Sequence, residues 1–382
     1  MTSCIVFWQR MLTPHMTELA RELALLGVEV HYVAEQALSE ERRAMGWAAG
    51  DLDAVQVHMV TDAQQARDLV DRLPAGAVHI TQGVRANGLV AAAQKQIMAR
   101  RARHYPIMEK VDLRGPIGRI KPIVYRLQFW AMRGGVEGLL AIGDQTPDWI
   151  TRRSPCSMRV VPFAYFLGGK RPGRAAYAAE RFKFIFVGSL IDRKRVDLLL
   201  EALSGIEDRP FDLEILGDGP ERALLQAKAD ALLPGIVFFL GSQDMAATIG
   251  RIAGADCLVL TSDHDGWGAV VSEAQINGTP VICSSECGAA GTVRASAVGA
   301  VFQAGDVDAL RRCLADMLER GPFSEAERER LAHWAQCLTA KAGARYLLDI
   351  VSGKAEGPVN PPWEIDLAKD STFGRQGDDR SL

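Results

Sequence analysis

The feature that most constrains the fold of this 382-residue chain is a repeated alternation of short apolar runs with helical patterns. Short apolar runs bounded by turn residues indicate buried strands, and the amphipathic periodicity between them indicates helices. Such an alternation predicts a parallel sheet covered by helices on both faces. The chain is too long for one ordinary core, so we expect two doubly wound α/β domains.

The expected elements divide into two series. Strands of the first half are expected at 5–8, 29–33, 55–59, 77–81, 105–109 and 139–142, and helices at 15–26, 64–73, 89–101 and 145–152. Strands of the second half are expected at 182–187, 211–216, 236–240, 257–260, 281–283 and 300–303, and helices at 196–203, 221–232, 245–253, 269–276, 307–319 and 325–350.

The boundary between the two series is a segment rich in Gly, Lys, Arg and Pro at 168–174, which is typical of a linker. The end of the chain contains prolines and few apolar residues, so we expect it to be disordered. The predicted organisation is a first domain at 1–165, a linker at 166–180, a second domain at 181–324, a helix at 325–351 and a disordered tail at 352–382.

Composition excludes several classes of protein. Hydrophobic residues make up 48% and charged residues 24% of the chain, as in a soluble globular protein, and the net charge of −3 gives no indication of a nucleic-acid partner. The first ten residues lack the pattern of a signal peptide, and no apolar stretch approaches the ~20 residues of a membrane span. Seven cysteines without a Cys-x-x-Cys pair favour a reducing cytoplasm and no structural zinc.

The stretch CLVLTSDHDGWGAVVSEAQINGTPVIC at 257–283 predicts a strand, a loop, a helix and a second strand. The loop leaves the carboxyl end of a strand and leads into a helix whose first N–H groups are free, which is the geometry of an anion site. Two carboxylates, Asp265 and Glu273, frame this site and have the chemistry to hold sugar hydroxyls. A helix-entry acid and a solvated helical glutamate are the plainer interpretation of the same two residues.

A second candidate site follows the strand at 182–187. Gly188 allows a ligand to approach the backbone closely. Arg193, Lys194 and Arg195 then gather at the start of a helix, where the helix dipole disfavours cations, so a bound anion is the natural compensation. The alternative is a solvated basic turn.

These motifs together resemble a known family. An acid, a Gly-aromatic-Gly, a second acid eight positions after the first and then Gly-Thr-Pro-Val resemble the signature of retaining glycosyltransferases of family four. The resemblance implies the GT-B fold, in which two Rossmann-like domains face a cleft and the second domain holds a nucleotide-sugar. It implies that Glu273 contacts the ribose and Asp265 the donor sugar. Asp265 departs from the family, which usually has Glu at this position.

The resemblance extends to the basic segment and to several loops, in family order over residues 182–308. It implies that Lys194 neutralises the donor diphosphate, and that Arg193 replaces the family's arginine, because Ser189 occupies that position. The donor-binding residues implied by the matching positions are Gly188, Ser189, Gly217, Asp218, Gly219, Gly241, Ser242, Gly266, Trp267, Gly268 and Glu273.

The first domain resembles members of the family that make bacterial polysaccharides, through Trp8-Gln9, Thr13-Pro14-His15 and Met108-Glu109. His15 and Glu109 follow the carboxyl ends of predicted strands, where ligands of parallel sheets bind. The resemblance places both on the acceptor side and counts His15 among the catalytic residues with Lys194, Arg193, Asp265 and Glu273. A capping histidine is the plain alternative for His15.

The function implied is transfer of a sugar from a nucleotide-sugar to a saccharide, commonly lipid-linked, in polysaccharide or cell-envelope synthesis. The donor is a substrate, and no cofactor or metal is expected. Three alternatives stay open: a metal-dependent transferase using Asp263-His264-Asp265, a nucleotide-sugar epimerase of the same fold, and a non-catalytic subunit that binds nucleotide-sugar. The sugar, the base, the linkage and the oligomeric state cannot be read from the sequence.

The segment 95–133 predicts a further partner. It carries ten basic residues against two acids, a local charge of 10 − 2 = +8, and apolar residues are interleaved with the basic ones. Charge combined with interfacial side chains is typical of proteins that dock on anionic lipid. We therefore expect a cytoplasmic protein that is peripheral on the inner face of the cell membrane. A basic surface that packs on acidic parts of the same chain is the alternative.

Overall fold

Two parallel β-sheets, one in each half of the chain, organise the computed structural model, which describes residues 4–37, 52–85, 88–155, 158–169, 181–206, 210–353 and 359–364. The first sheet has the order β3-β2-β1-β4-β5-β6-β7, and the second has the order β10-β9-β8-β11-β12-β13. In both sheets the strand order reverses beside the first strand, which is the arrangement of a Rossmann-like doubly wound fold. The predicted two-domain α/β architecture is confirmed.

The first domain contains all but one of its strands where the alternation predicts them. The strands are β1 (Cys4–Met11), β2 (Glu29–Gln36), β3 (Gln56–Met59), β4 (Val78–Gln82), β5 (Arg103–Glu109), β6 (Leu139–Ile142) and β7 (Val160–Phe163). The helices are α1 (Pro14–Leu25), α3 (Ala63–Arg72), α4 (Gly88–Ala99), α5 (Lys121–Met132) and α6 (Thr146–Thr151), with a 3₁₀ turn at Pro116–Arg119. Both α5 and β7 are absent from the sequence prediction.

The second domain follows the prediction more closely. Its strands are β8 (Phe182–Val187), β9 (Phe211–Leu216), β10 (Val237–Gly241), β11 (Cys257–Leu260), β12 (Val281–Ser284) and β13 (Gly299–Phe302). Its helices are α7 (Val196–Ser204), α8 (Arg222–Leu232), α9 (Met245–Gly254), α10 (Ala269–Ile276), α11 (Ala290–Ser296) and α12 (Val307–Arg320), with a 3₁₀ turn at Asp192–Lys194. The central strands β8, β11 and β12 are buried on both faces, which explains their continuous apolar runs.

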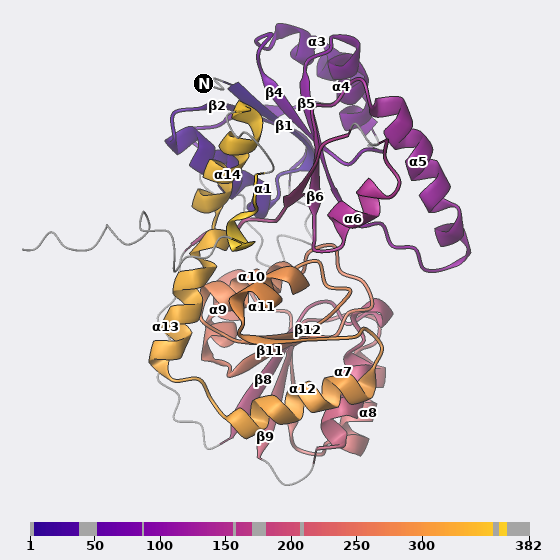
Figure 1. Ribbon diagram of the computed structural model, residues 1–382. Coiled ribbons are helices and arrows are strands. Elements are labelled where there is room, and N and C mark those ends of the chain that lie inside the picture. The colour runs from indigo at the N-terminus through magenta and orange to yellow at the C-terminus, as the bar shows by residue number, and fades with distance from the viewer. Residues whose placement is uncertain are drawn as a thin grey trace, which may run out of the picture.

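The chain then crosses back to the first domain through two helices, where the sequence predicts one. The helix α13 (Glu325–Trp334) ends in a 3₁₀ turn at Ala335–Leu338, and α14 (Ala340–Ser352) packs against α1. The break occurs because Thr339 is extended and lies beside Leu167 of the interdomain segment. Leu167 donates a backbone hydrogen bond to the carbonyl oxygen of Leu338 and accepts one from the amide of Ala340. Figure 1 shows α13 beside the second domain and α14 beside the first.

The prediction of a disordered tail is wrong for residues 359–364. A 3₁₀ turn, η4 (Pro362–Glu364), lies against the core, and only 9% of Trp363 is exposed. Burial of an aromatic side chain against apolar residues offsets the conformational entropy that a short segment loses when it becomes ordered. The remainder of the predicted tail at 354–358 and 365–382, and the linker residues 170–180, lie outside the described residues.

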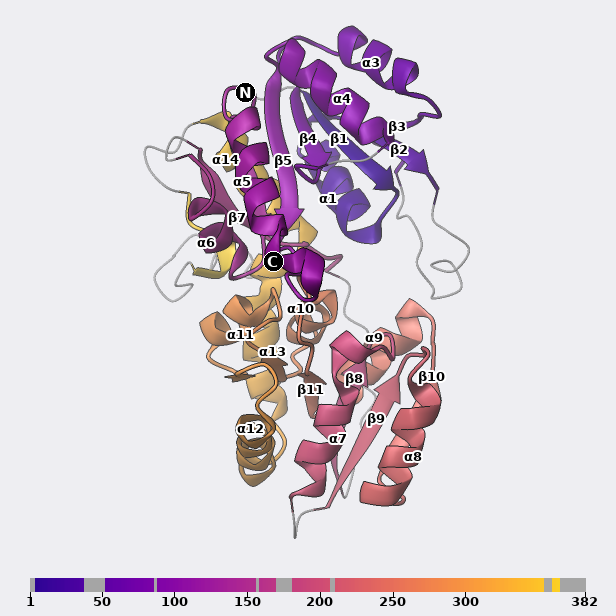
Figure 2. The same cartoon turned by 90° about the vertical axis from the view of Figure 1, so that its right-hand side faces the viewer.

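The two sheets direct the carboxyl ends of their strands toward each other. Figure 2 shows β5 pointing to the second domain and β9 pointing to the first. The loops that follow these strands therefore meet at the junction between the domains, where a ligand of either sheet is expected to bind.

Candidate functional site

An ion pair between Lys194 and Asp265 is the centre of the candidate site. The ammonium group of Lys194 donates a hydrogen bond to Oδ2 of Asp265, and 12% of the lysine side chain and 15% of the aspartate side chain are exposed. Lys194 ends the 3₁₀ turn after β8, whereas Asp265 lies in the loop after β11, so the fold brings together two groups 71 residues apart. The hydroxyl of Thr261 secures this contact by donating to the carbonyl oxygens of Lys194 and Arg195.

The two arginines beside Lys194 have different partners. Arg193 donates through Nη1 to the carbonyl oxygen of His264 over 2.8 Å, so its guanidinium lies at the loop that carries Asp265. Arg195 adopts a left-handed conformation (φ 50°) immediately before α7 and forms ion pairs with Asp197 and Asp263. The three cations are therefore not equivalent, because Arg195 pairs with two carboxylates and Lys194 with one, whereas Arg193 donates to a carbonyl oxygen.

Two loops of the second domain pack closely against each other through glycines. The backbone of Gly188 is so close to Gly217 that a Cβ on Gly217 would lie 1.9 Å from the carbonyl oxygen of Gly188. A Cβ on Gly219 would lie 2.3 Å from the carbonyl oxygen of Leu190. Only residues without a side chain fit here. The loops after β8 and β9 thus form one surface beside Lys194.

The other predicted donor-binding residues border this surface. The amide of Gly217 donates to the carbonyl oxygen of Gly241, which links the loop after β9 to the end of β10. Asp218 accepts from Arg222 at 2.9 Å. Ser189 and Ser242 are both exposed. The structure therefore brings the predicted loops to one edge of the second sheet.

The helix α10 begins and ends as the sequence predicts. Gly268 is its N-cap with φ 82°, and Gly278 follows the helix with φ 74°. Glu273 projects from this helix, and among the described residues no hydrogen bond or ion pair satisfies its carboxylate. Burial alone raises the pKa of Glu273 to about 7. A carboxylate that is desolvated and unpaired is suited to accept hydrogen bonds from a ligand.

The first domain contributes Glu109 at the end of β5. The carboxyl group of Glu109 accepts a hydrogen bond from the hydroxyl of Tyr165 over 2.7 Å. Burial raises the pKa of Glu109, the negative charge of Asp265 adds to this rise, and the Tyr165 hydrogen bond partly offsets it. A Cβ on Gly266 would lie 1.9 Å from Oε2 of Glu109, so the two domains touch at this point. The ring centroids of His15 and Tyr165 are 5.4 Å apart.

Sequence reasoning did not identify Tyr165. This residue follows β7 in the interdomain segment, where the sequence shows only a short apolar run with a proline. No local pattern marks it, because its partners Glu109 and His15 are 56 and 150 residues away in the chain. The structure thus brings His15, Glu109 and Tyr165 together on the first domain, facing the loop of Asp265 and Gly266.

Polar contacts hold the domains together beside this site. Lys110 forms an ion pair with Glu286 at 2.8 Å and also donates to the side chain of Gln145. The amide of Asp144 donates to the carbonyl oxygen of Gly288, and its carboxylate pairs with Arg294 at 2.6 Å. The loop after β12 is therefore anchored to the ends of β5 and β6.

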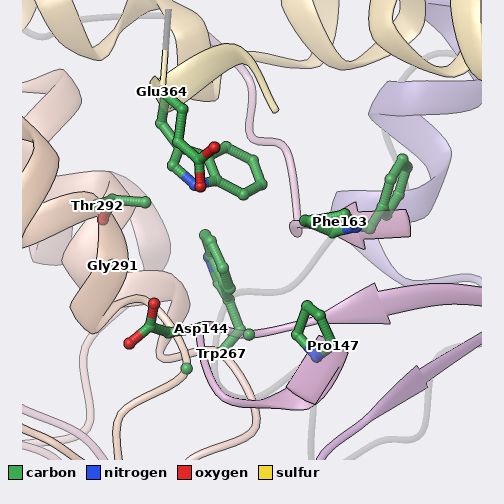
Figure 3. Close-up of a pocket in the computed structure, with 11 residues that line it drawn as sticks. Asp144, Pro147, Phe163, Trp267, Gly291, Thr292 and Glu364 are labelled. Atoms are coloured by element: carbon green, nitrogen blue, oxygen red, sulfur yellow. The ribbon is translucent and has the colours of Figure 1, made fainter. Parts of the chain in front are cut away.

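Trp267, one of the predicted donor-binding residues, has a buried side chain. Its indole is 3% exposed and donates to the hydroxyl of Ser272 over 3.1 Å. The indole lines a cavity of about 180 Å³ between the domains, together with Phe163 and Trp363 (Figure 3). Asp265 and Trp267 of one loop therefore contact different surroundings, since Asp265 pairs with Lys194 and Trp267 lines the cavity.

A group of possible metal ligands lies elsewhere. Among the described residues, ligand atoms of Cys4, Glu29 and His31 lie within 4.8 Å of one another. They are at the amino ends of β1 and β2, opposite the edge that carries His15. Both ring nitrogens of His31 already have partners, Glu29 at 3.0 Å and His58 at 2.9 Å. This group takes no part in the candidate site.

Part of the chain matches a known family. Residues 174–335 match the family described as glycosyl transferases group 1. Over 129 residues the chain is 32% identical to the lipopolysaccharide core biosynthesis glycosyltransferase LpsE of Rhizobium meliloti, covering 34% of this chain and 37% of that protein. Over 194 residues it is 31% identical to a GDP-mannose-dependent α-(1-6)-phosphatidylinositol monomannoside mannosyltransferase of Mycolicibacterium smegmatis, covering 46% and 49%. The matches span about half or less of these relatives.

The fold is shared with solved structures over nearly the whole chain. The lipopolysaccharide outer core galactosyltransferase WaaB superposes with a TM-score of 0.68 at 14% identity, covering 92% of this chain and all of that chain. HepE of Anabaena in complex with UDP superposes with a TM-score of 0.70 at 13% identity, covering 91% and 99%. The protein therefore has the GT-B fold.

Proposed function

We propose that this protein is a retaining, metal-independent glycosyltransferase that moves a sugar from a nucleotide-sugar to a saccharide acceptor. The observation that carries the proposal is the Lys194–Asp265 pair, which lies within the segment matching glycosyl transferases group 1 and directly opposite Glu109. The relatives that act in lipopolysaccharide and mannolipid synthesis support a role in building the cell envelope.

In this proposal the donor exchanges the Lys194–Asp265 contact for contacts of its own. The Lys194 ammonium turns to the diphosphate, whose negative charge is larger than that of one carboxylate, and Arg193 assists it. Asp265 then accepts hydrogen bonds from the sugar hydroxyls. Glu273 accepts hydrogen bonds from the ribose, which supply the partners that its carboxylate lacks among the described residues. The glycine-lined surface of Gly188 and Gly217 admits the donor close to the backbone.

The reaction breaks the bond between the anomeric carbon and the diphosphate oxygen and forms a bond from that carbon to an acceptor oxygen. The acceptor hydroxyl attacks from the face that the diphosphate leaves, so the configuration is retained, and its proton passes to the departing phosphate. Lys194 stabilises the charge that develops on this phosphate. His15, Glu109 and Tyr165 lie on the acceptor side, where they orient the attacking hydroxyl.

The ion pairs around Asp263-His264-Asp265 favour a mechanism without a metal. A metal-dependent transferase needs both carboxylates of its Asp-x-Asp motif as ligands. Here Asp263 pairs with Arg195 at 3.3 Å and approaches Arg114 at 3.8 Å, and Asp265 pairs with Lys194. Recruiting these carboxylates to a cation would take from Lys194 its ion-pair partner and would leave Arg195 and Arg114 with only Asp197 and Asp112.

A panel of nucleotide-sugars tests the proposed activity. Purified protein is incubated with UDP-, GDP- and other nucleotide-sugars, and donor hydrolysis and thermal stabilisation are measured together. We expect one donor both to stabilise the protein and to be hydrolysed slowly in the absence of acceptor. Stabilisation without turnover, even with an acceptor extract, favours the non-catalytic subunit instead.

We further propose that the acceptor is lipid-linked and that the first domain docks on an anionic membrane surface. The helix α5 lies on the outer side of this domain, away from α14 (Figure 1). Its side chains Ile123, Leu127 and Trp130 are 63%, 65% and 59% exposed. They line a groove of about 470 Å³ whose rim carries Arg126, Arg152 and Arg153. An apolar row beside arginines fits an interface of acyl chains and phosphates.

The structure revises which basic residues of 95–133 face outward. Arg100 pairs with Asp71, and Arg103 with Glu137, so these charges are neutralised by the protein itself. Phe129, expected among the interfacial side chains, is fully buried. The docking surface is therefore α5 with the end of α6, rather than the whole segment. Among the described residues, none of the helices combines the length and apolar character that a membrane span requires.

Vesicle binding tests this surface. Wild-type protein should bind vesicles that contain anionic phospholipid and be released by salt, because the attraction is screened. Leu127→Glu and Arg126→Glu should each weaken binding. Leu224→Glu is the matched control, because Leu224 is 69% exposed but lies on α8 of the other domain. Binding that ignores lipid charge, or that Leu224→Glu weakens equally, contradicts the assignment.

A further inference from the structure

We propose that Trp363 is a positioning residue, which holds the loop 263–268 of the candidate donor site from behind through its contact with Trp267. The inference rests on the proposed function, because it assigns the C-terminal segment a part in that site. Trp363 lies 98 residues after Asp265 in the chain, in a segment that the sequence gives no reason to connect with catalysis.

The contacts of Trp363 place the segment 359–364 across the junction of the domains. The centroid of its ring lies 5.9 Å from that of Trp267 in the second domain and 6.3 Å from that of Phe166 in the interdomain segment. A backbone hydrogen bond from Glu364 to Pro361 closes the turn that presents the indole. Trp363 thereby joins an aromatic cluster to the back of the loop that carries Asp265.

Trp267 is firmly connected to that loop. Its carbonyl oxygen accepts hydrogen bonds from the amide of Ala289 over 2.7 Å and from the thiol of Cys287 over 3.2 Å. Its indole donates to Ser272 on α10, the helix that also carries Glu273. A shift of the indole therefore breaks its hydrogen bond to Ser272 and displaces the loop through the backbone of Trp267.

The front of the loop has no free space to absorb such a shift. A Cβ on Gly266 would meet Glu109 at 1.9 Å, and a Cβ on Gly288 would meet the carbonyl oxygen of Gly266 at 1.9 Å. The free space lies at the back instead, in the 180 Å³ cavity lined by Trp267, Trp363 and Phe163 (Figure 3). Without Trp363, Trp267 can move into this enlarged cavity and carry Asp265 away from Lys194. Trp363 prevents this movement.

Two variants and a pair of truncations test the role. Trp363→Ala removes the contact, whereas Trp363→Phe keeps an aromatic ring in place. A chain that stops after residue 358 removes the whole segment, and a chain that stops after Glu364 is the matched control, because it keeps the segment and loses only residues 365–382.

Hydrogen exchange gives a readout that does not require activity. In Trp363→Ala and in the chain ending at 358, we expect faster exchange in a peptide covering 261–270, with unchanged exchange in β1. The chain ending at Glu364 should exchange like the full chain. Unchanged exchange at 261–270 overturns the proposal, as does faster exchange throughout both domains, which indicates a general loss of stability.

Kinetics separates positioning from folding. A small misplacement of a sugar-binding group costs turnover, so kcat should fall about 10-fold or more in Trp363→Ala while the Kd for free nucleoside diphosphate stays within about twofold. Trp363→Phe should recover most of the loss. Unchanged kcat overturns the positioning role. A wild-type protein that turns over no donor refutes the proposed function, and the exchange experiment then still decides whether Trp363 holds the loop.

Discussion

The carboxylate of Glu273, which has no partner in the part of the chain that the structure describes, leads to a prediction about stability as well as binding. Burial raises its pKa to about 7, so the folded protein holds this proton more tightly than the unfolded chain, where the ordinary value is 4.5. The contribution of Glu273 to the free energy of unfolding therefore falls as the pH rises from about 4.5 to 7, and stays low above that. Each tenfold change in proton affinity is worth about 1.4 kcal/mol, so the charged form costs the fold at most about 3 kcal/mol at pH 8, and less to the extent that solvent reaches this half-buried side chain.

The substitution Glu273→Gln removes this cost, because the amide fills the same recess without a charge. We expect the variant to be more stable than wild type by up to about 3 kcal/mol at pH 8, and to match it near pH 5, where Glu273 is protonated. The midpoint of thermal unfolding should rise by several degrees at pH 8. The exposed Glu319 on α12 supplies the control variant Glu319→Gln.

The same substitution should weaken binding of free nucleotide by about 10- to 100-fold, since a charged acceptor of the ribose hydroxyls is lost. Calorimetric unfolding from pH 5 to pH 8 and titration with nucleoside diphosphate measure the two effects. Gain of stability together with loss of affinity is the signature of a carboxylate kept for a ligand. A Glu273→Gln variant whose stability follows the wild-type pH profile refutes the reasoning.

Three further predictions concern the neighbouring groups. Asp265→Asn should lower turnover while the affinity for free nucleotide changes little, because its partner is the sugar; equal weakening of nucleotide by Asp265→Asn and Glu273→Ala contradicts this division. Activity should survive EDTA, and loss that magnesium or manganese restores would favour the Asp-x-Asp alternative. Tyr165→Phe should lower the free energy of unfolding by about 1–2 kcal/mol where Glu109 is ionised, because the hydroxyl stabilises the charged carboxylate, and the difference should shrink as the pH falls and Glu109 takes up a proton. A pH-independent difference would argue against this contact.

The sheets were predictable because each buried parallel strand appears in the sequence as a short apolar run between more polar segments. The strand β7 was not predicted because it contains Pro162, which normally indicates the end of a strand. An edge strand tolerates proline, and β7 lies at the edge of the first sheet. The helix α5 was not predicted because its exposed face is also apolar. Ile123, Leu127 and Trp130 are exposed, so the sequence lacks the amphipathic periodicity of a helix that packs on a core with one face.

The candidate site was predictable only where its residues share one segment. The loop at 263–268 and α10 follow local rules of turns and caps, so Asp265 and Glu273 could be found in the sequence. The pairing of Lys194 with Asp265, the neutralisation of Arg195 by Asp263, and the contact of Tyr165 with Glu109 join distant parts of the chain. No local pattern in the sequence predicts these contacts. The packing of Trp363 was equally unpredictable, because its partners are distant in the chain.

The measurement that tests the account most directly is the turnover of nucleotide-sugar by Lys194→Ala beside Lys341→Ala. Lys341 is an exposed lysine on α14, so its loss controls for a change of one charge. We expect Lys194→Ala to bind nucleotide with the same stoichiometry as wild type. Its kcat should fall about 100- to 1000-fold, which corresponds to about 3–4 kcal/mol of stabilisation at the leaving phosphate. Lys341→Ala should have the kcat of wild type. A Lys194→Ala variant whose kcat stays within about threefold of wild type contradicts the assignment of this site.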